Sequence, residues 1–89
     1  MNENSIYKKQ LGVMIDKVDG KFYILNNYVV FEINEVGARI IDLCNGSTSI
    51  SEISIKLASY FQCQYEKIYT DVLGFIETLE KNGLIVKCS

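Results

Sequence analysis

The sequence has 89 residues, of which 48% are hydrophobic and 22% charged, with a net charge of −2. This composition can fill the core of one small domain and is not that of a disordered chain. The slight acidic excess disfavours a nucleic-acid-binding protein, which needs a basic face. The chain has no His, and Cys44, Cys63 and Cys88 are far apart. Because metal sites and acid–base catalysis usually need such residues in clusters, we expect no enzyme activity, catalytic residue, metal or cofactor.

No apolar run reaches the length of a membrane span, and the first ten residues, MNENSIYKKQ, lack the hydrophobic segment of a signal peptide. We therefore expect a cytoplasmic protein that has no membrane partner. Residues 1–10 are predicted to be a polar lead-in, in which Ile6 and Tyr7 could dock on the body although nothing in the sequence fixes them. Residues 11–86 are predicted to form a single domain, and residues 87–89 a C-terminal tail.

The first part of the domain predicts three antiparallel strands, over residues 11–18, 21–25 and 28–33. Asp19-Gly20 separates the first two, and an Asp-Gly pair is a strong signal for a tight hairpin turn. Asn26-Asn27 predicts a second tight turn, because Asn tolerates the left-handed region. The third strand, YVVFEI, carries apolar side chains on both faces. Either helices cover both faces, or one face or the edge accepts a partner, since only Glu32 protects that edge.

A first helix is predicted over residues 35–44, with Asn34 as its N-cap and Asn45-Gly46 as its stop. Gly37 lies in its first turn, where it costs about 1 kcal/mol relative to Ala, so we expect another element to approach closely there. Arg39 is predicted to be a solvated or surface-paired charge.

Two more helices follow. The second helix of the chain runs over residues 50–61, and Ser49 and Glu52 are spaced as a capping box at its start. The third helix runs over residues 65–82 and ends at Gly83, before a short apolar tail that could be a last strand. Its core stripe contains Ile68, Val72, Phe75, Ile76 and Leu79. Tyr65, Tyr69 and Leu73 widen the apolar arc, which indicates a second packing face or a ligand groove.

This order predicts an α+β fold similar to a winged helix-turn-helix, with a three-stranded antiparallel sheet followed by three helices. A small DNA-binding regulator is one alternative function, but the third helix is net acidic where a recognition helix needs basic or amide side chains. Capture of a peptide as an added strand on the third strand is the other. Tyr23, Tyr28, Tyr65 and Tyr69 suit peptide contacts, although each could equally be an ordinary surface or core residue.

The runs GKFYILN, FEINEVGARIIDLCNG, SISEI and DVLGFIETLEKNGLI resemble the PqqD-like family over residues 11–86. Members of this family are recognition elements for ribosomally made, post-translationally modified peptides (RiPPs). The resemblance implies a non-catalytic peptide chaperone that binds the leader of a precursor peptide beside the third strand. It would then present the precursor to a modifying enzyme, often of the radical S-adenosylmethionine type, or to a leader peptidase. The EVGARI form resembles the lasso-peptide type more closely than proteins of quinone-cofactor synthesis.

The resemblance also implies a set of peptide-binding residues. The strand edge would be formed by Tyr28, Val29, Val30, Phe31 and Glu32. Candidates from the third helix for the other wall of the cleft are Tyr65, Tyr69, Val72, Leu73 and Ile76, and their periodicity leaves open which of them face the core. A third alternative is a homodimer in which the strand edge pairs with a second copy, and this is compatible with leader binding.

Overall fold

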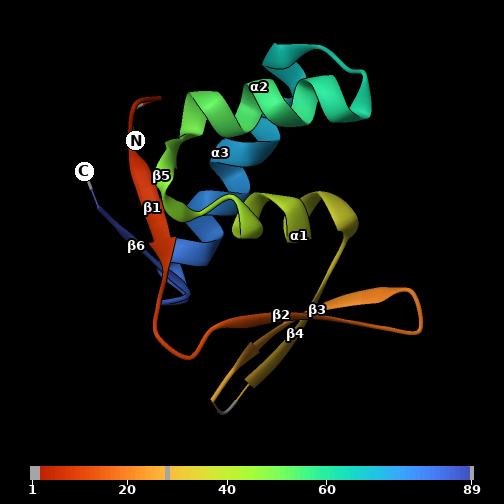
Figure 1. Ribbon diagram of the computed structural model, residues 1–89, viewed down its shortest axis with the longest axis vertical. Helices are drawn as coiled ribbons and strands as arrows, with labels where there is room; N and C mark the ends of the chain where they lie inside the picture. The colour runs from red at the N-terminus through yellow and green to blue at the C-terminus, as the bar shows by residue number, and fades with distance from the viewer. Residues whose placement is uncertain (1–2, 28, 89) are drawn as a thin grey trace.

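The computed structural model describes residues 3–27 and 29–88, which form two three-stranded antiparallel sheets and three helices (Figure 1). The predicted α+β class and the three-stranded sheet followed by three helices are confirmed, and the second sheet was not predicted. In chain order the elements are β1 Ile6–Lys9, β2 Met14–Val18, β3 Lys21–Asn26, β4 Val29–Ile33, α1 Glu35–Asp42, β5 Asn45–Ser49, α2 Ile50–Phe61, α3 Tyr65–Lys81 and β6 Ile85–Lys87.

The strands β2, β3 and β4 form a meander, here called the wing sheet, that projects from the helices (Figure 1). The predicted Asp19-Gly20 turn is confirmed, with φ of 52° and 79° at its two residues, as a type I′ turn requires. The first strand begins at Met14 rather than at residue 11, because the chain turns at Gly12, whose φ is 85°. Asn26, which was predicted to lie in the second turn, belongs to β3 and pairs with Val29, whereas Asn27 is in a turn.

The sheet passes directly into α1, as the sequence predicted. The side-chain oxygen of Asn34 accepts the Gly37 N–H at 2.8 Å, so Asn34 is the N-cap of this helix. The helix ends at Asp42 with Leu43 as its C-cap, two residues earlier than expected. Asn45 and Gly46 do not cap the helix but begin β5, and Gly46 has a φ of 82°.

The second sheet, here called the body sheet, has the strand order β5-β1-β6. Its central strand lies within the segment predicted to be a lead-in, and it contains Ile6 and Tyr7, for which the sequence allowed docking but did not fix it. Tyr7 is 3% exposed in the core, and Ile6 pairs with Ser49. The predicted short last strand is present as β6, which pairs with β1 along its length.

The helices α2 and α3 follow the local signals in the sequence. Ser49 and Glu52 form the predicted capping box, in which the Ser49 hydroxyl accepts the Glu52 N–H at 3.1 Å and the Glu52 carboxylate accepts the Ser49 N–H at 3.0 Å. Gln62 ends α2 in the left-handed conformation, with a φ of 52°. None of the helices in the described ranges combines the length and apolar character needed to cross a bilayer.

Candidate functional site

The outer edge of β4 has no neighbouring strand in the described part of the chain. In a hairpin with a two-residue turn, the pair next to the turn exchanges hydrogen bonds, and such pairs then alternate with non-bonded ones. Asn26 pairs with Val29 and Ile24 with Phe31, so these pairs bond across to β3. The N–H and C=O groups of Val30 and Glu32 therefore point outward, away from β3. They can accept an added strand.

The two faces of the wing sheet are unlike. Phe31 and Ile33 are half-buried against the core, on the face toward α1. Val30 lies on the opposite face and is 63% exposed, and Glu32 is also exposed. The alternative in which helices cover both faces of the third strand is therefore wrong. Only the face that carries Phe31 and Ile33 is packed against the core. Among the predicted edge residues, Tyr28 lies outside the described residues.

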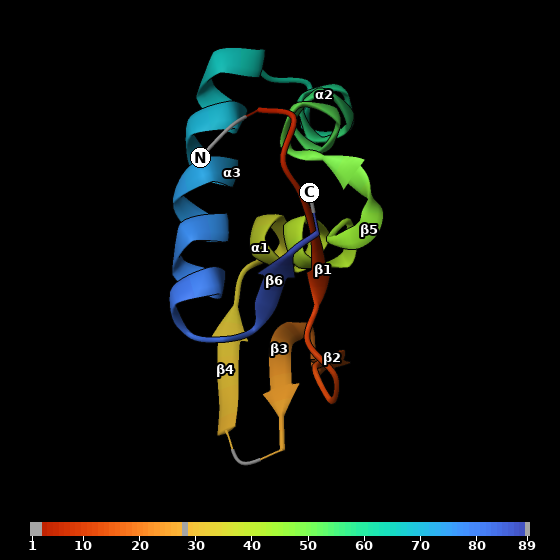
Figure 2. The same ribbon diagram turned by 90° about the vertical axis from the view of Figure 1, so that its left-hand side faces the viewer.

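A hollow of about 250 Å³ lies between the start of α1 and the middle of α3. Its mostly apolar lining contains one carboxylate and is formed by Asn34, Val36, Gly37, Ile40, Asp71 and Phe75. Figure 2 shows β4 as the strand of the wing sheet on the same side of the molecule as α3, with β2 on the other side. The free edge of β4 and the helix α3, which lines this hollow, are therefore on one side of the molecule.

Gly37 accounts for the close approach that the sequence indicated. A Cβ at this position would lie 2.8 Å from Cζ of Phe75 and 3.3 Å from Oδ1 of Asn34. The absence of a side chain at Gly37 lets the Phe75 ring reach the first turn of α1, where the ring lines the hollow. Gly37 thus allows α3 to pack closely against the junction between β4 and α1.

The third-helix residues predicted for the cleft do not line this hollow. Val72 and Ile76 are both 0% exposed and belong to the core, so their side chains do not face this hollow. Residues in an α-helix are about 100° apart, which places Tyr69 and Leu73 on one flank of the core stripe and Asp71 on the other. The tyrosine flank faces α2, because the Tyr65 hydroxyl lies 3.5 Å from that of Ser51 and the Tyr65 and Tyr69 rings stack.

Asp71 and Phe75 were missed as site residues. The sequence placed Phe75 in the core stripe, and Asp71 was counted only as part of the acidic surface of the helix. The signal that could have found them is Gly37 itself. A glycine in a first helical turn lowers helix stability, so its presence there suggests that another residue approaches closely. The sequence does not say which residue that neighbour is.

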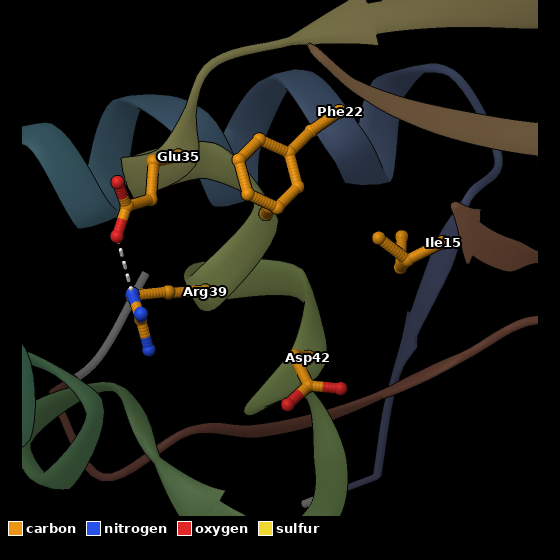
Figure 3. Close-up of a pocket in the computed structure, with 6 residues that line it drawn as sticks. Ile15, Phe22, Glu35, Arg39 and Asp42 are labelled. Atoms are coloured by element: carbon orange, nitrogen blue, oxygen red, sulfur yellow. Dashed lines mark hydrogen bonds and ion pairs between the residues drawn. The ribbon is translucent and has the colours of Figure 1, made fainter. Parts of the chain in front are cut away.

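A second depression lies on the other flank of α1, around Arg39 (Figure 3). Ile15 and Phe22 of the wing sheet face Glu35, Arg39 and Asp42 across a volume of about 220 Å³. The Arg39 side chain is 39% exposed but has partners within the protein. Its Nε donates to Glu35 at 3.1 Å, and its guanidinium lies 3.7 Å from the ring centroid of Tyr60 and donates to the Tyr60 hydroxyl. The prediction of a surface-paired charge at Arg39 is confirmed.

Among the residues that the structure describes, the titratable groups with shifted pKa values are Tyr7, Cys44 and Glu52, none of which belongs to β4. Burial raises the pKa of the Cys44 thiol to about 12, so it is a protonated core residue at neutral pH. Burial also raises the pKa of Tyr7, with a further contribution from the nearby Glu80 carboxylate. The pKa of Glu52 is lowered by its hydrogen bonds with the Ser49 backbone and side chain.

A model of the family described as "Coenzyme PQQ synthesis protein D (PqqD)" matches residues 12–85. The chain belongs to the PqqD family. A curated relative, the PqqA binding protein of Bradyrhizobium diazoefficiens, is 30% identical over 54 residues, which are 61% of this chain and 52% of the relative. The chain thus spans about half the length of that relative.

Solved structures share the fold at low sequence identity. The PqqD truncation of Methylobacterium extorquens PqqCD, a stand-alone RiPP recognition element, superposes with a TM-score of 0.84 at 16% identity, covering 96% of this chain and 93% of that one. Lasso peptide synthetase B1, complexed with the leader peptide, gives 0.76 at 15% identity, with 90% and 96% covered. TbiB1 in complex with the TbiA(beta) leader peptide gives 0.73 at 20% identity, with 88% and 93% covered.

Proposed function

We propose that this protein is a non-catalytic adaptor that binds the leader of a ribosomally made precursor peptide and presents it to another enzyme. The observation that carries the proposal is the free outer edge of β4, with the backbone groups of Val30 and Glu32 pointing toward solvent beside the hollow of α1 and α3. Membership of the PqqD family supports it. So do the relatives, which are named as a PqqA binding protein, a RiPP recognition element and synthetase components complexed with leader peptides.

The expected affinity follows from the groups available. Val30 and Glu32 can make about four backbone hydrogen bonds with an added strand, each contributing a net ~1 kcal/mol. One aliphatic side chain buried in the hollow adds about 1.5–3 kcal/mol. After the costs of association and ordering, these contributions correspond to roughly micromolar binding.

The enzyme that receives the precursor is either a modifying enzyme, of the radical S-adenosylmethionine type, or a leader peptidase of the lasso-peptide type. The resemblance of the EVGARI segment favours the second, and the fold likeness to synthetase B1 is compatible with it. The genes beside this one separate the two, because each pathway encodes a short precursor next to its own enzymes.

The test is a titration of isotope-labelled protein with a synthetic leader of the precursor encoded beside the gene. We expect backbone amide shifts in NMR spectra at Val30, Glu32 and the α3 residues Asp71 and Phe75. Tyr69→Ala should leave the affinity within about twofold of wild type, because Tyr69 lies on the other flank of α3. A saturating leader that shifts no β4 amide contradicts the proposal.

A proline substitution distinguishes the edge of β4 from that of β2. Because the Val30 N–H points away from β3, Val30→Pro removes an outward donor and leaves the ladder of β3 and β4 intact. We expect at least about tenfold weaker leader binding, with the fold retained by circular dichroism. Lys17→Pro is the matched control: its N–H also lies outside the ladder and bonds to Oδ1 of Asp16 at 2.9 Å. If Lys17→Pro weakens binding instead, the leader occupies the β2 edge.

Two alternative functions are tested with the same protein. A second copy paired through β4 would give a mass that rises with protein concentration in light scattering and falls when leader is added. Duplex DNA would bind in a strongly salt-dependent way. The α3 surface makes this outcome unexpected, since its charged residues are four carboxylates and two lysines: Glu66, Asp71, Glu77, Glu80, Lys67 and Lys81.

A further inference from the structure

The exposed face of the wing sheet is ordered into cross-strand rows. Residues directly opposite one another on neighbouring strands have their side chains on the same face and in contact distance. One row is apolar and consists of Met14, Leu25 and Val30, with Met14 and Val30 each 63% exposed. The next row consists of Asp16, Tyr23 and Glu32 and has a carboxylate at each end. Both rows stop at the free edge of β4.

The carboxylate of Glu32 has no cationic partner among the residues that the structure describes. The ion pair found in that part of the chain joins Arg39 to Glu35, on the other side of α1. Lys21 lies diagonally across from Glu32 on the same face, but its ammonium is not within ion-pair distance. An added strand would therefore place a side chain beside an unpaired carboxylate.

The register fixes which residues of an added strand meet these rows. Val30 and Glu32 carry the outward backbone groups, so in an antiparallel pair they lie directly opposite two residues of the new strand that are separated by one residue. All the strand pairs described in this protein are antiparallel. The residue between those two points to the opposite face, toward α1 and the hollow that Phe75 lines.

We propose that the leader bound by this protein carries a Lys or Arg opposite Glu32 and an aliphatic or aromatic residue opposite Val30, with an apolar residue between them. Read from the N-terminus of an antiparallel leader, the order is basic, apolar, aliphatic. The basic residue extends the row of Tyr23 and Glu32, and the aliphatic residue extends the row of Leu25 and Val30. The inference rests on the proposed function, because it requires strand addition at β4.

A second explanation of Glu32 is that its charge only keeps two copies of the protein from pairing edge to edge. That explanation predicts no preference for a basic residue in the bound peptide. A reversal of the charge at residue 32 separates the two. If Glu32 pairs with a basic residue of the leader, Glu32→Lys should select an acidic residue at the same position of the peptide.

The probe is a phage-displayed library of random 12-residue peptides, selected in parallel on wild-type protein, Glu32→Lys and Glu32→Gln. The matched control is Glu77→Lys, which makes the same charge change on the exposed surface of α3, away from the edge. Thermal unfolding shows that each variant is folded. Peptides enriched on wild type are synthesised, and their contact with the β4 amides is checked by NMR.

We expect wild type and Glu77→Lys to enrich Lys or Arg two positions before an aliphatic or aromatic residue. Glu32→Lys should enrich Asp or Glu at that position, and Glu32→Gln should enrich neither charge. Exchanging the basic residue of a selected peptide for Glu should weaken its binding to wild type about three- to tenfold at low salt.

Peptides that bind at β4 with no charge preference, or with one that Glu32→Lys leaves unchanged, overturn this inference and leave the proposed function standing. Enriched peptides that shift no β4 amide contradict the proposed function, and the inference falls with it.

Discussion

The wing sheet and the body sheet of this protein are built in opposite ways. The wing sheet consists of three consecutive strands with short connections, and every pairing in it is local. The body sheet joins the beginning, the middle and the end of the chain, since Ile6 pairs with Ser49 and Lys9 with Ile85. Local pairing costs little chain entropy, whereas the distant pairs must be held by burial. Tyr7 and Ile85 are 3% and 2% exposed in the body sheet.

The difference separates stability from binding. The body sheet closes the chain around the core and also fixes its ends, because the Ile50 N–H donates to Ser5 and the Cys88 N–H to Ile6. The wing sheet buries one face, and its other face and its β4 edge remain open. A partner strand can join such a sheet without displacing anything. We therefore expect substitutions in the body sheet to affect folding, and those on the open parts of the wing to affect binding.

The largest expected effect compares one residue from each sheet. Ile85→Ala should lower the free energy of unfolding by about 2–5 kcal/mol, because it leaves a cavity in the core. Val30→Ala should lower it by less than about 1 kcal/mol, since its side chain is mostly exposed and only strand preference is lost. Urea denaturation followed by circular dichroism measures both. Equal losses would mean that the open face of the wing is part of the folding core, and the distinction between the sheets would fail.

The same distinction explains what the sequence could predict about the fold. The wing strands, the Asp19-Gly20 turn and the Asn34 cap have local signals within a few residues. The body sheet does not, because β1 is IYKK and β5 is NGSTS, and neither alternates between apolar and polar residues. Asn45-Gly46 is also a good helix stop, so local reasoning placed a turn where the chain begins a strand. The pairing of these strands depends on contacts between distant parts of the chain.

The candidate site shows the same limit. The free edge of β4 could be predicted because the strand carries apolar side chains on both faces with only Glu32 to protect its edge, and because of the family resemblance. The helical wall could not, because the sequence does not say which of the two flanks of the core stripe faces β4. The tyrosines at 65 and 69 made one flank the more conspicuous, but Asp71 and Phe75 lie on the flank that faces α1. Only the packing of α3 on Gly37 decides between the flanks.

An intermediate effect is expected at the junction where the wing meets the helices. Gly37→Ala should gain about 1 kcal/mol of helix propensity, yet its Cβ would lie 2.8 Å from the Phe75 ring. We expect the displacement of the ring to cancel this gain and lower stability by about 1 kcal/mol. In a Phe75→Leu background the contact is relieved, so the same change should raise stability. A double-mutant cycle by urea denaturation should therefore give a coupling of about 1–2 kcal/mol, and additive effects would contradict the contact.

The smallest expected effect is a pH dependence in the body of the protein, at the capping box where β5 passes into α2. The folded state lowers the pKa of Glu52 from its ordinary value of 4.5, chiefly through the hydrogen bond from the Ser49 N–H. A lowered pKa gives stability that is fully present above pH 4.5 and is lost as the pH falls through the folded value. Wild type should therefore be more stable than Glu52→Gln at pH 7, and this difference should shrink below about pH 4.5. Thermal unfolding across this range measures it, with Glu77→Gln as the control for removing an exposed carboxylate. A difference that stays constant down to pH 3 would show that the Glu52 charge does not contribute to the cap.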